Sequence, residues 1–193
     1  MLRLVGGSAK GCRLSLPRSS DVRPATDRLR VSLFALLAPR LAGARVLDLF
    51  AGSGALGLEA LSRGAAHSTF VENGAEALRT LSANIGAVGF PGRCLIVEYD
   101  LRHKLAIVER ADLAFVDPPF SFFADTAGLE ILRELLDDLT GRILTPGGLV
   151  VVRHEDKDED RARSLLAAGG GTITLERSYG RSRIKVVAVP GDA

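Results

Sequence analysis

The chain has 193 residues, of which 47% are hydrophobic and 25% charged, and its formal net charge is +2. This length suits one α/β domain with a substantial core and a small appendage, and it argues against two complete domains. No apolar run is long enough to span a membrane and no secretory signal opens the chain, so we expect a cytoplasmic protein without a membrane partner. The cysteines and histidines lack the spacing of metal ligands, so no metal site is expected.

The first 30 residues are more basic than the rest of the chain. They hold seven basic residues against two acidic ones, whereas the remainder is slightly acidic. Such a segment predicts a phosphate-contacting surface for nucleic acid, although any single arginine is more simply explained as a solvated surface residue. A second basic concentration lies near the C-terminus, at Arg177, Arg181, Arg183 and Lys185.

Two short alternating segments open the chain, at residues 2–5 and 12–16, and the glycines between them predict a small β-hairpin. Apolar residues then recur at near-helical spacing from Leu29 to Leu37. Thr26 is the expected N-cap of this helix, and Pro39 ends it.

From residue 45 onward the pattern alternates between strand and helix. We expect strands near residues 45–50, 67–72, 93–97, 112–116 and 148–153, and helices near 54–63, 74–86 and 126–139. Two further strands, 172–175 and 184–189, would form a C-terminal hairpin. The pattern predicts an α/β, Rossmann-like fold: a doubly wound, mainly parallel sheet of seven strands, with one antiparallel strand near the C-terminus and a small N-terminal β-hairpin outside it. The acidic run 155–160 is interpreted as a solvated loop or helix start.

A glycine-rich turn, Ala51-Gly52-Ser53-Gly54-Ala55-Leu56-Gly57, follows the first strand of this sheet. Its glycine spacing is that of the dinucleotide-binding fingerprint. Asp48, near the end of the strand, would repel a pyrophosphate and attract a cation. S-adenosylmethionine carries an ammonium and a sulfonium and has no phosphate, so the turn fits this cofactor better than NAD. Glu72, at the end of the next strand, can accept hydrogen bonds from the ribose hydroxyls of either cofactor.

Acidic residues stand at or just beyond several predicted strand ends, where doubly wound sheets bind their ligands. Asp100 could accept from the adenine amino group while Leu101 packs on the ring. The alternative is that Asp100 caps a helix from Leu101 to Val108. The candidate cofactor-binding residues are Asp48, Phe50, Ala51, Gly52, Ser53, Gly54, Glu72, Asn73, Asp100 and Leu101.

The tetrapeptide Asp117-Pro118-Pro119-Phe120 follows a predicted apolar strand. An exocyclic amine is a poor nucleophile because its lone pair is delocalised. The Asp117 carboxylate and the Pro118 carbonyl could accept hydrogen bonds from its N–H groups. Pro119 would stiffen the segment, and Phe120 would stack on an extruded base. These four residues are therefore candidate catalytic residues for methylation of an amino group. A polar turn after a buried strand is the alternative.

Three segments together resemble the bacterial 16S rRNA guanine-N2 methyltransferases: Arg23-Pro24-Ala25-Thr26-Asp27-Arg28-Leu29-Arg30, residues 48–60 and the tetrapeptide from Asp117 to Phe120. Residues 6–11 and Tyr179-Gly180 are similar to the opening and closing hairpins of that family. The resemblance covers nearly the whole chain. It departs from the family at Ala25, where a threonine is frequent, and at Asn73, where an acidic or small residue is more usual.

The resemblance implies a class I methyltransferase fold and transfer of methyl from S-adenosylmethionine to the exocyclic N2 of one guanine in 16S rRNA or the small ribosomal subunit. We expect a hairpin extension over residues 1–22, a methyltransferase domain over 23–193 and a monomer. The resemblance also implies that the hairpin and the segment 23–30 help to hold RNA. The candidate RNA-binding residues are Arg3, Lys10, Arg13, Arg23, Thr26 and Arg28.

Three other functions remain open at this point. A DNA adenine-N6 methyltransferase would share the tetrapeptide, but the chain is short of residues for a DNA-recognition insertion. A nucleic-acid-binding module could keep the fold without turnover, although the set of Asp48, Glu72 and Asp117 argues against such decay. A nicotinamide oxidoreductase would leave the tetrapeptide without a role and place Asp48 beside phosphate.

Overall fold

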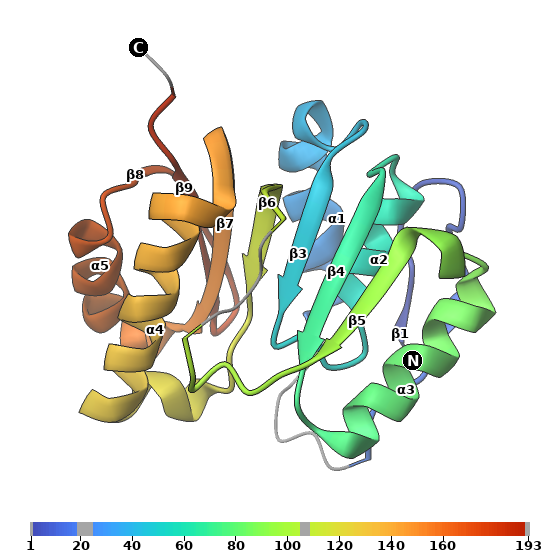
Figure 1. Cartoon of the computed structure of the whole chain (residues 1–193), viewed down its shortest axis with the longest axis horizontal. Helices are drawn as coiled ribbons and strands as arrows, with labels where there is room; N and C mark the ends of the chain where they lie inside the picture. The colour runs from blue at the N-terminus through green and yellow to red at the C-terminus, as the bar shows by residue number, and fades with distance from the viewer. Residues whose placement is uncertain (1, 19–24, 105–108, 192–193) are drawn as a thin grey trace. The chain divides into compact units, whose positions relative to one another are not determined.

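The computed structural model of the chain describes residues 2–18, 25–104 and 109–191 (Figure 1). The chain divides into two compact units, Met1–Asp100 and Leu101–Ala193. The expected boundary between a hairpin extension and a catalytic domain, at residue 22, falls among residues outside the described ranges, as does the candidate RNA-binding residue Arg23.

The first unit is built on parallel strands in the order β5-β4-β3, namely Cys94–Glu98, His67–Glu72 and Arg45–Leu49. Leu49 lies beside Val71, and Glu72 lies beside Glu98, so the chain leaves these strands at one edge of the sheet. Helix α2 (Ala55–Ser62) follows β3 and packs on β3 and β4, and α3 (Ala75–Val88) packs on β5. The register therefore brings residues 50–54, 72–74 and 99–100 to one place.

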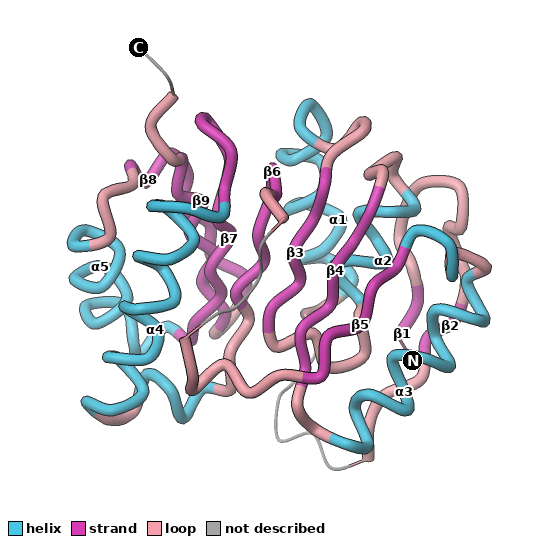
Figure 2. The backbone as a smooth tube through the Cα atoms, in the orientation of Figure 1, coloured by secondary structure: helices cyan, strands magenta, loops and turns pink. Residues whose placement is uncertain are grey.

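The N-terminal part of this unit confirms the predicted hairpin and helix cap. Strands β1 (Leu2–Arg3) and β2 (Arg13–Leu14) pair antiparallel, and Figure 2 shows them beside α3. Helix α1 (Asp27–Leu37) begins after Thr26, whose hydroxyl accepts from the Leu29 N–H at 3.3 Å. A 3-10 turn, η1 (Ala38–Arg40), holds Pro39 and ends the helical segment.

The second unit has strands in the order β6-β7-β9-β8: Ala111–Val116, Leu144–Glu155, Ser182–Ala188 and Thr172–Tyr179. β6 and β7 are parallel, whereas β9 is antiparallel to both β7 and β8. The predicted antiparallel strand near the C-terminus is therefore confirmed. Helices α4 (Thr126–Asp138) and α5 (Glu159–Ala168) lie side by side next to these strands (Figure 1).

Strand β7 starts earlier than the sequence pattern predicts. Pro146 and Gly147 read as strand breakers, and the strand was expected near residues 148–153. In the structure, Ala111 of β6 pairs with Leu144 and Leu113 pairs with Leu149. This irregularity lets β7 pass through the proline and the glycines and still pair with β6 on both sides of them.

Short helical turns complete the fold: η2 (Pro91–Arg93), η3 (Phe120–Phe123), the π-helical η4 (Leu139–Ile143) and η5 (Asp156–Asp158). Within the described ranges, no helix is both long enough and apolar enough to cross a membrane, and no cluster of three His, Cys, Asp or Glu residues is placed to hold a metal ion. Cys12 and Cys94 are free thiols. Burial raises the pKa of Cys94 to about 11, so this thiol is protonated at neutral pH.

Candidate active site

The turn between β3 and α2 has an unusual backbone conformation. Phe50 has a φ of 58°, which makes it the only non-glycine residue in the described ranges with a positive φ. Gly52 and Gly54 follow with φ of 55° and 76°. A side chain held in the left-handed region costs energy and is found disproportionately at ligand sites. The conformation supports the prediction that residues 50–54 bind the cofactor.

Two carboxylates brace this turn through backbone amides. Asp48 is 2% exposed, and its Oδ2 accepts from the Gly57 N–H at 2.8 Å. Glu72 Oε2 accepts from the Gly52 N–H at 2.8 Å, and its Oε1 accepts from the Asn73 N–H at 2.9 Å. An ionised carboxylate has about four acceptor sites, so Glu72 keeps capacity for a ribose hydroxyl. Both predicted cofactor residues therefore also fix the turn that is predicted to hold the cofactor.

Gly57 is required for the close packing of α2 on β4. A Cβ at this position would lie 2.4 Å from Phe70 Cε1 and 2.5 Å from Ser68 Oγ, and both side chains are buried. Gly57→Ala is therefore expected to destabilise the protein by about 1–3 kcal/mol through overpacking. Gly86→Ala, in α3, meets nothing within 4 Å. It should be neutral or stabilise by about 0.5–1 kcal/mol, because alanine is the better helix former.

Urea denaturation of the two variants beside the parent protein measures this difference. Equal midpoints for Gly57→Ala and the parent protein would show that α2 moves away from β4 without cost, and would contradict the prediction.

The third strand end adds Asp100 to the same edge. The Tyr99 N–H donates to the Glu72 carbonyl at 3.0 Å, which continues the alignment of β5 with β4. Asp100 is half-buried one residue later, and Asn73 is exposed. Residues 101–103 form a turn and a bend where the alternative reading expected a helix to start, and residues 105–108 of that expected helix lie outside the described ranges. Leu101 is buried, at 5% exposure, and it is the first residue of the second unit.

The tetrapeptide from Asp117 to Phe120 follows β6 directly. Val116 lies beside Val152 on the parallel strand β7, so Asp117 and Arg153 occupy the next positions of the two strands. Arg153 Nε donates to Asp117 Oδ1 at 2.6 Å, and the side chains are 4% and 15% exposed. Burial raises the pKa of the Asp117 carboxyl, and the charge and hydrogen bond of Arg153 oppose that rise.

The segment after Asp117 is held on several sides by residues of its own unit. The Arg153 guanidinium lies 5.5 Å from the centre of the Phe120 ring, and the His154 ring lies 5.8 Å from that of Phe123. Arg161 Nη1 of α5 donates to the Phe123 carbonyl at 2.6 Å. The loop that carries the four candidate catalytic residues is therefore fixed in place, as positioning catalysis requires.

The predicted RNA-binding residues divide into exposed and structural ones. Lys10, Arg13 and Arg28 are exposed, and exposed Arg3 pairs through Nε with Asp27 Oδ2 at 3.1 Å. The Thr26 hydroxyl caps α1.

Arg30 belongs to the basic segment by sequence, yet its side chain is fully buried. It pairs with Asp27 Oδ1 at 2.7 Å and lies 3.7 Å from Glu59 Oε2. It is therefore part of the core and adds nothing to the basic surface.

Three polar side chains that hold the hairpin were missed by the sequence analysis. Glu59 Oε2 accepts from the Val5 N–H at 2.7 Å, and Ser62 Oγ accepts from the Ala9 N–H at 2.9 Å. Asn84 Oδ1 accepts from the Ser15 N–H at 2.8 Å, and its Nδ2 donates to the Ser53 carbonyl at 2.9 Å. For Glu59 a signal existed, because it is a charged residue within the apolar run of α2 and such residues are buried only when paired.

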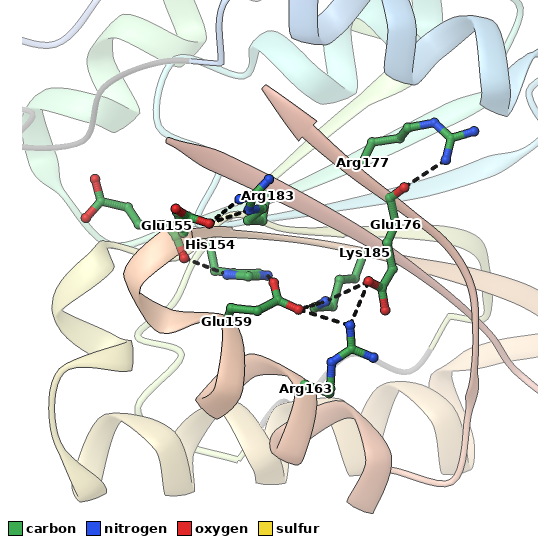
Figure 3. A network of polar contacts seen from close by, with 9 residues as sticks. His154, Glu155, Glu159, Arg163, Glu176, Arg177, Arg183 and Lys185 are labelled. Carbon is green, nitrogen blue, oxygen red and sulfur yellow. Dashed lines mark hydrogen bonds and ion pairs between the residues drawn. The ribbon is translucent and has the colours of Figure 1, made fainter. Parts of the chain in front are cut away.

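A second polar cluster lies between β7, α5, β8 and β9 (Figure 3). Lys185 is 1% exposed, and its Nζ lies 2.6 Å from Glu159 Oε1 and 3.4 Å from Glu176 Oε2. Arg183 pairs with Asp156 beside them. A pocket of about 220 Å³ here is lined by as many acidic as basic side chains. The C-terminal basic concentration is thus partly neutralised, which makes this pocket a poor phosphate site.

Comparison with known proteins agrees with these features. The family model described as conserved hypothetical protein 95 matches residues 2–188. "Putative rRNA methyltransferase YlbH" of Bacillus subtilis is 30% identical over 189 residues, which cover 96% of this chain and 97% of that protein. Ribosomal RNA small subunit methyltransferase D of Escherichia coli is 42% identical over 120 residues, which cover 62% of this chain and 60% of that protein.

A solved structure described as "Putative methyltransferase yhhF from Escherichia coli" superposes with a TM-score of 0.77 at 29% identity and covers 99% of each chain. This likeness confirms the predicted class I methyltransferase fold. The match of the family model over nearly the whole chain, together with the names of the relatives, leads to one conclusion: the chain belongs to the family described as conserved hypothetical protein 95, an rRNA methyltransferase family.

Proposed function

We propose that this protein transfers the methyl group of S-adenosylmethionine to the exocyclic N2 of a guanine in 16S rRNA, free or within the small ribosomal subunit. The observation that carries the proposal is the fixed loop of Asp117, Pro118, Pro119 and Phe120, which places a carboxylate that is only 15% exposed directly after β6. The names of the relatives support rRNA as the substrate class.

The first unit supplies the features that a cofactor site for S-adenosylmethionine needs. Asp48 suits the ammonium or sulfonium charge, and Glu72 suits the ribose hydroxyls. Asp100 follows at the same sheet edge, where its carboxylate suits the adenine amino group. The left-handed turn at Phe50 and Gly52 lets the backbone approach the ligand closely. When bound, S-adenosylmethionine supplies an electrophilic methyl group on sulfur.

In the second unit, the Asp117 carboxylate and the Pro118 carbonyl would accept hydrogen bonds from the N–H groups of the guanine amine. Acceptance localises the nitrogen lone pair as the C–N bond forms and the C–S bond breaks, and the sulfonium becomes a thioether. The methylated nitrogen then loses a proton to Asp117 or to water. Phe120 offers a flat face on which the extruded base can stack.

The proposed function is tested with tritiated S-adenosylmethionine and, in parallel, small ribosomal subunits, 16S rRNA and adenine-containing duplex DNA, followed by nucleoside analysis of the product. Labelled N2-methylguanosine from rRNA or subunits is the expected product. N6-methyladenine from DNA would instead identify a DNA adenine methyltransferase. Tight cofactor binding without transfer to any of the three would favour a binding module without turnover.

The exposed basic residues of the N-terminal segment predict salt-dependent RNA binding. Arg13→Ala and Arg28→Ala should each weaken RNA binding and reduce the log–log salt slope by about 0.7–0.9 if each side chain makes one phosphate contact. Cofactor affinity should stay unchanged, because neither residue is among the predicted cofactor contacts. Filter binding over a series of salt concentrations measures the slope, with Arg133→Ala at an exposed position of α4 as the matched control. An unchanged slope in both variants would contradict a role for this segment in RNA binding.

A further inference from the structure

The side chain next to Asp117 on the neighbouring strand contacts both functional groups of the tetrapeptide. Arg153 Nε donates to Asp117 Oδ1 at 2.6 Å, and the same guanidinium lies 5.5 Å from the Phe120 ring centre. Arg153 is 4% exposed, so its side chain has little freedom to take other positions. The parallel register of β6 and β7 sets this placement, because Val116 and Val152 pair immediately before the two residues.

The hydrogen bond that the structure describes on Asp117 reaches one oxygen only. Arg153 Nε engages Oδ1, which leaves Oδ2 able to accept from a substrate N–H. A hydrogen bond from an arginine also fixes the plane of the carboxylate, and thereby the direction of the lone pairs on Oδ2. The Arg153 guanidinium lies over one face of the Phe120 ring, so a base would stack on the opposite face of the ring.

Charge matters here as much as direction. Burial raises the pKa of Asp117, and a protonated carboxyl would lose acceptor strength for the amine. Among the described residues, Arg153 is the charged group that acts against this rise. The other neighbour of Arg153 in the sheet is Ile184 of β9, which carries no charge, and the tetrapeptide contributes no second ionisable group.

We infer that Arg153 is a positioning residue for methyl transfer, which holds Asp117 by one oxygen and seats Phe120, so that the other oxygen and the opposite ring face meet the substrate amine and its base. This inference rests on the proposed function. A residue that only stabilised the fold would change the amount of active enzyme, and it would leave the pH dependence of each active molecule unchanged.

The test compares Arg153→Gln and Arg153→Lys with the parent enzyme, using kcat against pH on the RNA substrate that the parent methylates. Activity needs ionised Asp117, so it is present above the pKa of that group and is lost as the pH falls through it. Removing the cation raises the pKa of Asp117. The acid limb of the kcat–pH profile of Arg153→Gln should therefore move to higher pH by about one pH unit or more. We expect kcat to fall about 10- to 100-fold at pH 7 and to recover partly at pH 9, with KM for S-adenosylmethionine within about twofold of the parent.

Arg153→Lys keeps the charge and should restore the acid limb without restoring the full kcat, because lysine lacks the planar fork and the flat face that meets Phe120. Arg133→Gln, at an exposed position of α4, is the matched control and should behave as the parent. An equal loss of kcat at every pH, or a gain of activity showing that Arg153 competes with the substrate, would overturn the inference.

A carbon-13 NMR titration of the Asp117 carboxyl in the protein alone separates this inference from the proposed function. If no RNA were methylated by the parent, the proposed function would fail, while the titration would still report whether Arg153 holds the carboxyl ionised. A carboxyl that titrated at the same pH in the parent and in Arg153→Gln would refute the electrostatic role in either case.

Discussion

Asp117→Asn is expected to reduce methyl transfer by about 10²–10³-fold, with cofactor affinity retained. Asparagine keeps an oxygen that can accept from Arg153 Nε, so the ordering of the loop should survive. The charge is lost, and the second position becomes an NH₂ donor that faces the N–H of the substrate amine. Single-turnover kinetics with saturating S-adenosylmethionine measure the loss, and calorimetry measures cofactor binding.

Asparagine is a better probe than alanine at this position. Alanine would remove the carboxylate that Arg153 Nε binds and leave one charge of this buried pair uncompensated by the other, at a cost of about 3–5 kcal/mol in folding stability. Asp112→Asn is the matched control, because Asp112 lies on the same strand and is only partly buried. Asp117→Asn with parental single-turnover rates would remove Asp117 from the reaction, and the tetrapeptide would then be the polar turn considered in the sequence analysis.

Glu59→Gln is expected to destabilise the protein by about 3–5 kcal/mol. Glu59 is fully buried and receives the Val5 N–H at 2.7 Å and Arg63 Nε at 2.6 Å. Fully buried Arg30 lies 3.7 Å away, and burial lowers the pKa of its guanidinium while Glu59 and Asp27 raise it. The NH₂ group of glutamine would face one of these hydrogen-bond donors and could not accept from it. Arg30 and Arg63 would also lose the negative charge of Glu59.

Urea denaturation should show a midpoint lowered by about 1.5–2.5 M, if the slope is near 2 kcal/mol/M. Glu98→Gln, on an exposed position of β5 in the same unit, is the matched control and should stay within about 0.5 kcal/mol of the parent. A midpoint for Glu59→Gln close to that of the control would mean that the buried charges reorganise and do not depend on Glu59.

Much of the fold was predictable because the spacing of apolar residues in strands and helices is visible in a single sequence. The strand His67–Glu72 was predicted to the residue, and β3, β5, β6 and α4 were predicted to within a residue or two. Helix α5 was not predicted beyond a possible start in the acidic run, because its first residues, Glu159, Asp160 and Arg161, carry no apolar signal. Its stability comes from packing on α4 and β7, which is a tertiary effect.

The site was predictable where one segment carries the signal, and it was missed where two segments meet. The glycine turn and the tetrapeptide are continuous, so their spacing is visible in the chain. Arg153 is 36 residues from Asp117, and its role depends on the register of β6 and β7. Aligning the predicted ends of the two strands, Val116 and Arg153, would have placed Arg153 one position from Asp117. Arg30 shows the converse, because it reads as basic surface and is buried against Glu59.

The Asn84 amide joins the chain at Ser15 to the glycine turn at Ser53, and this bond has a consequence for how the protein can be divided or recombined. A shortened chain that starts after the hairpin would remove both bonds between the buried Asn84 amide and Ser15, next to the cofactor turn, and keep the bond to Ser53. Exchanging hairpins between relatives would require exchanging the residues of α2 and α3 that receive them. We therefore expect the hairpin to behave as an integral part of the first unit.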